Sequence, residues 1–96
     1  MAIIHANDNN FNEITSQGTV LVDFYADWCG PCRMQGEVLN SFSQIDVLKV
    51  NVDKYSEVAR QYGIMSIPTL ILFENGKILK SHTGFMNVSD LEEFVR

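Results

Sequence analysis

The sequence predicts an α/β fold in which helices cover both faces of a mixed β-sheet. Three observations support this prediction: strand-like and helix-like segments alternate along the chain, the central strand-like segments are apolar on both faces, and an Asn-Gly pair separates the last two strands. Alternating elements favour parallel strands, whereas an Asn-Gly turn forms an antiparallel hairpin. A chain of 96 residues is expected to form a single domain, residues 1–96.

The first elements are a short strand, a short helix and a long strand. The strand is expected at Ala2–His5. The helix follows because Asn10 and Glu13 have the spacing of a capping box and Gly18 provides a stop. The run Thr19–Tyr25 is rich in β-branched and aromatic residues, which predicts a central strand buried on both sides.

The middle of the chain repeats this alternation. A helix is expected over residues 30–42, where apolar residues recur at helical spacing at Met34, Val38, Leu39 and Phe42. Residues 46–53 predict a second buried strand, and residues 56–63 a helix that Gly63 ends.

The last third begins with two strands, residues 69–73 and 77–83, on either side of Asn75-Gly76, which is a strong hairpin signal. The chain ends in an amphipathic helix, for which Ser89 and Glu92 have the spacing of a capping box.

Composition excludes several functional classes. The chain is 46% hydrophobic and 20% charged, as expected for a globular protein. A net charge of −5, with seven scattered Lys and Arg residues, argues against nucleic-acid binding. No apolar run approaches the roughly 20 residues that span a bilayer. The first ten residues lack a basic segment followed by an apolar one, so we expect no signal peptide and a cytoplasmic protein.

Cys29 and Cys32 lie three residues apart where a strand ends and a helix begins. The helix N-terminus favours an anion, so the pKa of the Cys29 thiol is expected to fall. Cys29 then suits the role of nucleophile, and Cys32, one turn further on, that of the resolving thiol. Pro31 is tolerated in the first turn, and Gly30 leaves room for another chain to approach. Arg33 could also favour the thiolate.

Three other interpretations of the cysteines compete with this one. A zinc site needs four ligands, and only His5 and His82 remain, on distant segments. Haem attachment needs a histidine where this chain has Arg33. A structural disulfide would close a very small loop and stabilise little. The redox interpretation is therefore favoured, without a metal.

Asp23 interrupts the apolar run Thr19–Tyr25, on the strand face that it shares with Leu21. Because both faces are apolar, we expect the carboxyl to be enclosed, and burial raises the pKa of a carboxylic acid. Such a group could take the proton from Cys32 as that thiol attacks. The alternative is an aspartate that turns to solvent or forms a salt bridge.

Lys49 is a second charged residue in a strand expected to be buried. If the two strands are adjacent, Lys49 could approach Asp23 and modulate its titration. A lysine that reaches solvent from the strand is the alternative.

Two segments together, VDFYADWCGPCRM and GIMSIPTLILFENG, resemble the thioredoxin family, and the similarity covers nearly the whole chain. The resemblance implies a thioredoxin fold with a mixed sheet of about five strands and a redox-active Cys29–Cys32 disulfide. It also implies a protein-disulfide reductase that acts in electron transport and cell redox homeostasis. The partners expected are disulfide-containing proteins and a thioredoxin reductase, and the protein is expected to be a monomer without nucleic-acid or membrane partners. No cofactor is expected to be bound, because an external NADPH- or ferredoxin-linked reductase supplies the electrons.

The resemblance further implies a groove that binds an extended substrate segment. By base rate the Ile67–Pro68 bond should be trans, whereas the family holds this proline cis beside the cysteines. Ile67 then offers its backbone N–H and C=O to the substrate. The residues expected to form an apolar patch around Cys29 are Trp28, Gly30, Pro31, Ile67, Pro68 and Gly84. Alternatively, Trp28 fills the core and Gly84 only forms a turn.

The chain departs from the family pattern in a few places. Glu37, preceded by Gly36, replaces the usual helix proline, the segment after it is short, and Tyr25 replaces a common tryptophan. An oxidant or isomerase of the same fold, and a binding subunit of a larger assembly, remain alternatives to the general reductant.

Overall fold

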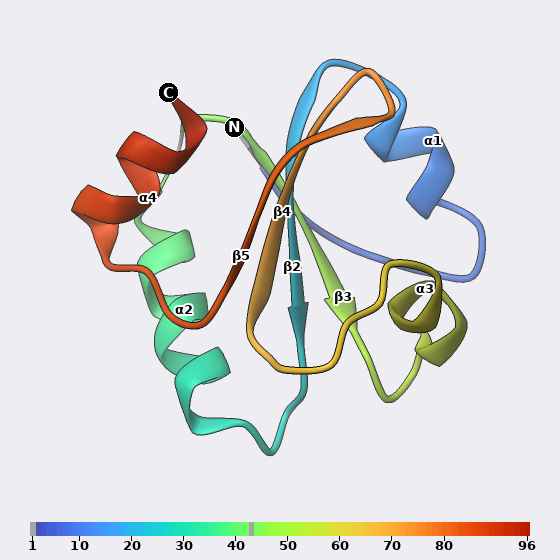
Figure 1. Cartoon of the computed structure of the whole chain (residues 1–96), viewed down its shortest axis with the longest axis horizontal. Helices are drawn as coiled ribbons and strands as arrows, with labels where there is room; N and C mark the ends of the chain where they lie inside the picture. The colour runs from blue at the N-terminus through green and yellow to red at the C-terminus, as the bar shows by residue number, and fades with distance from the viewer. Residues whose placement is uncertain (1, 43) are drawn as a thin grey trace.

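The structure, a computed structural model, describes residues 2–42 and 44–96, which form five strands and four helices in the predicted order (Figure 1). The strands are β1 (Ile3–His5), β2 (Thr19–Tyr25), β3 (Asp46–Asn51), β4 (Thr69–Glu74) and β5 (Lys77–Thr83). The helices are α1 (Phe11–Thr15), α2 (Gly30–Asn40), α3 (Ser56–Gln61) and α4 (Val88–Val95).

The strands form one mixed sheet in the order β1-β3-β2-β4-β5. β1 and β2 run parallel to β3, and β5 runs antiparallel to β4, as predicted. The orientation of β4 differs from the prediction, because it follows a helix and yet pairs antiparallel with β2. The six residues of α3 span only about 9 Å, whereas the seven residues of β2 span about 23 Å. The chain therefore stays at one end of the sheet, and β4 begins beside the end of β2.

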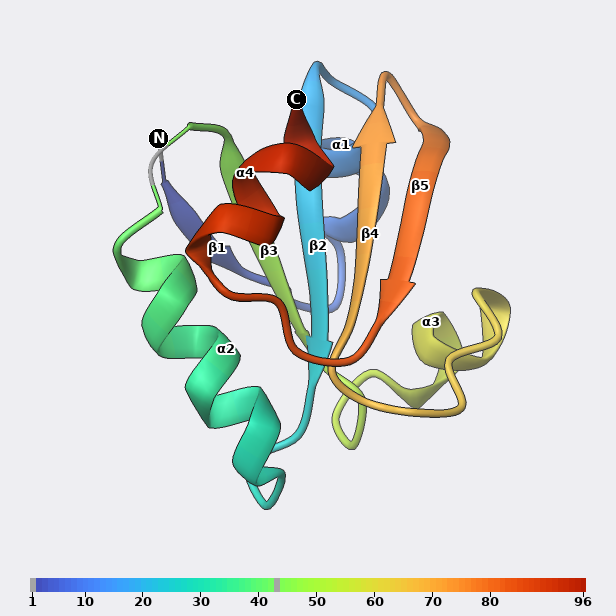
Figure 2. The same ribbon diagram turned by 60° about the vertical axis from the view of Figure 1, so that its left-hand side comes forward.

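Helices cover both faces of the sheet, with α1 and α3 on one face and α2 and α4 on the other (Figures 1 and 2). Alternation along β2 divides its side chains between two apolar clusters. The cluster under α1 and α3 contains Phe11, Val20, Val22, Phe24, Leu48, Val50, Ile71 and Phe73. The cluster under α2 and α4 contains Leu21, Leu39, Phe42, Val47, Leu70, Leu72, Met86 and Leu91. Burial on both faces explains why β2 is apolar almost throughout.

Local signals predicted the hairpin correctly but not the two N-terminal capping boxes. Asn75 and Gly76 join β4 to β5 with φ angles of 50° and 87°, the left-handed conformation that an Asn-Gly turn requires. The capping box expected at Asn10 is absent from the described residues: its side-chain oxygen accepts instead from the N–H of Asn7. Before α4 the cap is Asn87 and not the predicted Ser89.

The Asn87 side chain accepts a hydrogen bond from the N–H of Asp90 at 2.8 Å, and α4 begins at Val88. Asparagine is as good an N-cap as serine. The two candidates lie two residues apart, so the choice between them depends on where the preceding loop leaves the sheet.

Candidate active site

The cysteine pair lies where β2 passes into α2. Cys29 is the N-cap of α2, with an extended backbone (φ −91°, ψ 111°), and Pro31 occupies the first turn, as predicted. The backbone N–H of Cys32 donates to the Cys29 sulfur at 3.2 Å. Cys29 Sγ therefore accepts a hydrogen bond from one of the N–H groups that a helix N-terminus leaves without an intrahelical partner.

Cys29 and Cys32 are joined by a disulfide, with their Cα atoms 5.2 Å apart. Cys29 is 5% exposed and Cys32 is 2% exposed. Cys29 is thus the more accessible of the two, as predicted, but it is more covered than the sequence suggested. Ala26 and Ile67 pack against the pair, and the Ile67 carbonyl oxygen lies 3.8 Å from Cys29 Sγ.

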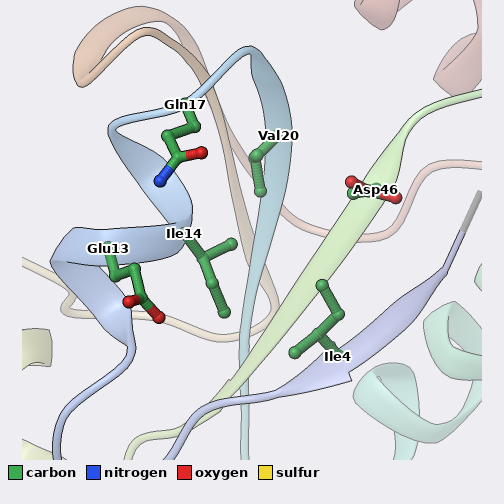
Figure 3. Close-up of a pocket in the computed structure, with 6 residues that line it drawn as sticks. All are labelled: Ile4, Glu13, Ile14, Gln17, Val20 and Asp46. Atoms are coloured by element: carbon green, nitrogen blue, oxygen red, sulfur yellow. The ribbon is translucent and has the colours of Figure 1, made fainter.

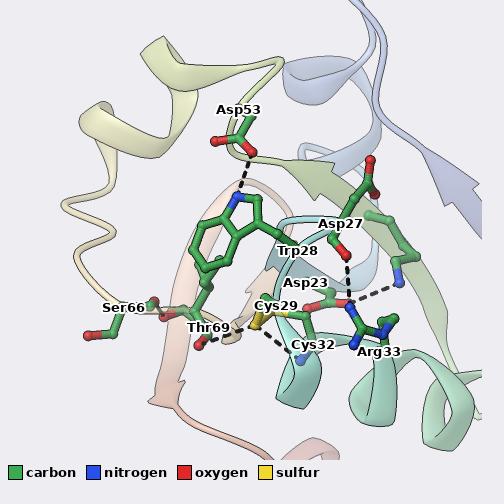
Figure 4. The surroundings of a disulfide bond; sticks show 11 residues. Asp23, Asp27, Trp28, Cys29, Cys32, Arg33, Asp53, Ser66 and Thr69 are labelled. Carbon is green, nitrogen blue, oxygen red and sulfur yellow. Dashed lines mark hydrogen bonds and ion pairs between the residues drawn. A yellow bond between two sulfur atoms is a disulfide. The ribbon is translucent and has the colours of Figure 1, made fainter.

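Trp28 extends over the surface beside the disulfide (Figure 4). Its side chain is 70% exposed, which contradicts the alternative that it fills the core. The indole Nε1–H donates to the Asp53 carboxylate at 2.9 Å, so the ring is held by a residue that follows β3. Arg33 donates to the backbone carbonyl of Asp27 at 3.0 Å (Figure 4).

A second segment faces the cysteines from the start of β4. The Ile67–Pro68 peptide bond is cis, which agrees with the family resemblance and not with the base rate. The Pro68 carbonyl oxygen accepts a hydrogen bond from the N–H of Gly84 at 2.8 Å. Gly84 has a φ of 106°, a conformation that favours glycine, so it forms a turn and also lies beside the proline.

Asp23 has no exposed surface, and sheet register places it opposite Lys49. The Lys49 ammonium lies 3.4 Å from one carboxylate oxygen, and within residues 2–42 and 44–96 neither oxygen accepts a hydrogen bond. Burial raises the pKa of Asp23 to about 6, and the nearby positive charge of Lys49 opposes the rise. The expected enclosed carboxyl is thus confirmed, and the neighbouring strand supplies an ion pair.

The Lys49 side chain is only 14% exposed, so it points to Asp23 and not to bulk solvent. Its ammonium also lies 4.5 Å from the centre of the Tyr25 ring. A Cβ atom at Gly36 would come within 3.3 Å of the same nitrogen. The position of Lys49 therefore depends on an aromatic face, a carboxylate and a glycine.

A pocket of about 440 Å³ opens on this side of the disulfide. Cys32, Lys49 and Tyr25 line it together with Ala26, Asp27, Arg33, Gly36, Glu37 and Asn40. Cys32 and Lys49, the ion-pair partner of Asp23, therefore share one opening to solvent.

The structure reveals two residues that the sequence analysis missed, Gln35 on α2 and Asp53 after β3. Met34, one of the apolar residues that recur at helical spacing, is 53% exposed, whereas Gln35 has no exposed surface. The buried residues of α2 are Cys32, Gln35 and Leu39. Their spacing of three and then four is a helical stripe, but a glutamine within it does not register as apolar. The role of Asp53 in holding Trp28 had no sequence signal.

A second pocket, of about 330 Å³, lies beside the first residues of β2 and therefore at the other end of that strand from the cysteines (Figure 3). It is lined by Ile4, Glu13, Ile14, Gln17, Val20 and Asp46. These carboxylates, the amide and the aliphatic side chains supply no redox chemistry. We therefore assign the redox activity to the end of β2 that carries the cysteines.

Residues 2–42 and 44–96 meet neither the requirements of a metal site nor those of a membrane-spanning helix. No group of three or more His, Cys, Asp or Glu side chains in these ranges is placed to hold a metal ion. None of the helices in the described part of the chain has both the length and the apolar character needed to cross a membrane.

Comparison with known proteins gives consistent matches. The thioredoxin family model matches residues 2–96. A thioredoxin of Bacillus subtilis (strain 168) is 42% identical over 100 residues, covering 99% of this chain and 96% of the relative. A thioredoxin of Alicyclobacillus acidocaldarius is 45% identical over 97 residues, covering 95% and 92%. The solved structure of a mutant thioredoxin from Halobacterium salinarum superposes with a TM-score of 0.90 at 31% identity, covering 98% and 88%.

Proposed function

This chain belongs to the thioredoxin family and is a protein-disulfide reductase, and we propose that it serves as a general reductant in which Cys29 attacks, Cys32 resolves and Asp23 manages the proton. The observation that carries the assignment of roles is the position of Cys29 Sγ, which receives the Cys32 N–H at 3.2 Å at the start of α2. In the reduced protein the same N–H and the helix dipole favour a Cys29 thiolate.

The reaction proceeds in two exchanges. The Cys29 thiolate attacks one sulfur of the substrate disulfide, a mixed disulfide forms, and the other substrate sulfur leaves as a thiolate that takes up a proton. Cys32 then loses its proton and attacks Cys29 Sγ, which breaks the mixed disulfide and releases the second substrate thiol. The substrate gains two electrons and two protons, and the protein ends with the Cys29–Cys32 disulfide.

Asp23 suits the second exchange because its pKa of about 6 lets it gain and lose a proton near neutrality. Lys49 modulates this titration through its charge. The pocket lined by Cys32 and Lys49 gives solvent a route by which the proton leaves.

The substrate lies across the surface formed by Trp28, Gly30, Pro31, Ile67 and Gly84; Pro68 belongs to this set, but its side chain is buried. Trp28 and Pro31 are exposed around the sulfur. An extended segment would pair with the backbone of Ile67. A flat, apolar contact of this kind accepts many sequences, so selectivity comes mainly from the disulfide itself.

We further propose that the protein works as a cytoplasmic, single-domain monomer in cellular redox balance. A separate thioredoxin reductase, NADPH- or ferredoxin-linked, reduces its disulfide, because this chain carries the thiols but offers no motif for an electron-donating cofactor. The assignment to the cytoplasm is supported by the cysteine usage, because structural disulfides are rare in that compartment and a vicinal pair there points to redox chemistry.

The test compares Cys29→Ser with Cys32→Ser, a matched pair that removes one sulfur each. Insulin reduction driven by dithiothreitol should fall to background in both variants. Only Cys32→Ser should accumulate a covalent complex with the substrate, which dithiothreitol releases. Insulin reduction that is unchanged in Cys29→Ser would rule out Cys29 as the nucleophile.

The direction of electron flow is tested by the midpoint potential of the Cys29–Cys32 couple. A reductant should have a potential below that of cytosolic glutathione, about −220 to −260 mV. A value well above this range would replace the reductant with an oxidant or isomerase.

A further inference from the structure

Gln35 is a fully buried polar side chain on α2, and its amide makes two hydrogen bonds to a single residue. Its Nε2 donates to the Met86 carbonyl oxygen at 3.0 Å, and its Oε1 accepts from the Met86 N–H at 2.7 Å. Gln35 has no exposed surface and Met86 is 4% exposed. A buried amide is costly unless it is hydrogen-bonded, and here both polar ends are paired with the same residue.

These two bonds connect the cysteine helix to the loop between β5 and α4. Gln35 follows Cys32 by one helical turn, so it is rigidly linked to the disulfide. Met86 follows Gly84 by two residues, and the Gly84 N–H donates to the Pro68 carbonyl at 2.8 Å. The Gln35 amide therefore closes a ring of contacts that runs from the disulfide through α2 and the β5–α4 loop to the cis-proline.

We propose that Gln35 is a positioning residue that holds the β5–α4 loop at a set distance from Cys29, so that a bound polypeptide presents its disulfide to the sulfur. The proposal rests on the function proposed above, in which Gly84 and Pro68 belong to the substrate surface. Gln35 touches no substrate, because it has no exposed surface. It acts through the backbone N–H and carbonyl of Met86.

If Gln35 positions the loop, its loss should affect the reduction of two kinds of substrate differently. A protein disulfide needs the surface beside Gly84, whereas a small aromatic disulfide needs only the sulfur. Loss of the Gln35 bonds leaves a buried N–H and a buried C=O unpaired on Met86, which the loop relieves by moving toward water. Binding of the polypeptide then weakens while the chemistry of Cys29 is unchanged.

The experiment compares Gln35→Leu with wild type, and with Gln61→Leu as the matched control, because Gln61 is an exposed glutamine on α3. The first readout is kcat and KM for insulin with dithiothreitol as electron donor. The second is the rate constant of the reduced protein with 5,5′-dithiobis(2-nitrobenzoate). For Gln35→Leu we expect kcat/KM for insulin to fall about tenfold through KM, which corresponds to about 1.4 kcal/mol.

The rate constant with the small disulfide should stay within about twofold, and Gln61→Leu should match wild type in both assays. Equal losses on insulin and on the small disulfide would overturn the proposal, because Gln35 would then act on the sulfurs or on folding. No loss on either would also overturn it. Wild-type protein that reduces neither substrate would instead defeat the proposed function.

Gln35→Glu gives an independent test if the leucine variant does not fold. A protonated glutamic acid can donate to the Met86 carbonyl and accept from its N–H, as the amide does. A carboxylate can only accept, and it faces the carbonyl oxygen. Burial raises the pKa of such a carboxyl. Relative to wild type, its insulin-to-small-disulfide rate ratio should fall as pH rises from 5 to 8; a flat ratio would refute the hydrogen-bonding role.

Discussion

Asp23→Asn tests the electrostatics of the site directly, because it removes an ionisable group with no exposed surface and nearly preserves its size. Burial raises the pKa of Asp23 from 3.8 to about 6, against the attraction of Lys49. The difference of about 2 pH units corresponds to about 3 kcal/mol, at about 1.4 kcal/mol per unit. This is the free energy by which the folded state disfavours the ionised carboxylate.

The sign of the pH dependence follows from proton binding. Between pH 4 and 6 the folded state holds the Asp23 proton and the unfolded state has released it. The free energy of unfolding therefore falls as pH rises through this interval. Below about pH 4 both states are protonated and the carboxyl imposes no penalty, whereas above about pH 6 the penalty is complete. Asparagine does not titrate, so the variant should gain about 3 kcal/mol over wild type at pH 8 and almost nothing at pH 4.

The assay is urea unfolding of the oxidised proteins at pH 4, 6 and 8, with equal m-values required for the comparison. Asp8→Asn is the matched control, because it makes the same chemical change at an exposed position. A gap between Asp23→Asn and wild type that does not change with pH would refute the reasoning. So would a variant that is less stable than wild type at pH 8.

Two further predictions concern α2 and α4. In Gly36→Ala, the new Cβ would come within 3.3 Å of the Lys49 nitrogen and displace it from Asp23. The pKa of Asp23, followed by carboxyl NMR titration, should then rise above about 6. An unchanged or lower pKa would contradict this prediction. In Asn87→Ala, loss of the α4 cap should lower the free energy of unfolding by about 1 kcal/mol in urea titrations. The control variant Ser89→Ala should change it by less than half as much. A larger loss in Ser89→Ala than in Asn87→Ala would instead support a capping box at Ser89.

Much of this protein is determined by short stretches of its sequence. Thr19–Tyr25 specifies a strand buried on both faces, because alternation and β-branching act between neighbouring residues. Asn75-Gly76 specifies the hairpin, because few residue pairs tolerate positive φ at both positions. The placement of Cys29 and Cys32 between a strand and a helix likewise depends only on residues close to them.

The pairing of Asp23 with Lys49 was determined partly by the local sequence and partly by the tertiary structure. Sequence alternation placed Asp23 on a buried face, and the idea that Lys49 might approach it depended on the two strands being adjacent. Only the sheet register, with Asp23 opposite Lys49, brought the groups to 3.4 Å. The register is set by many cross-strand contacts together, so it cannot be predicted from the sequence of one strand.

The tertiary structure alone decided how the site is assembled. The antiparallel course of β4 and the degree to which Cys29 is covered depend on segments far apart in the chain. The same is true of Gln35, which is 51 residues from the peptide groups that it binds. The cis bond before Pro68 was implied by the family resemblance, whereas the local preference of an X-Pro bond favours trans. Local sequence carries local backbone preferences, whereas the free energy of burying an amide or an ion pair depends on which partner the folded chain brings to it.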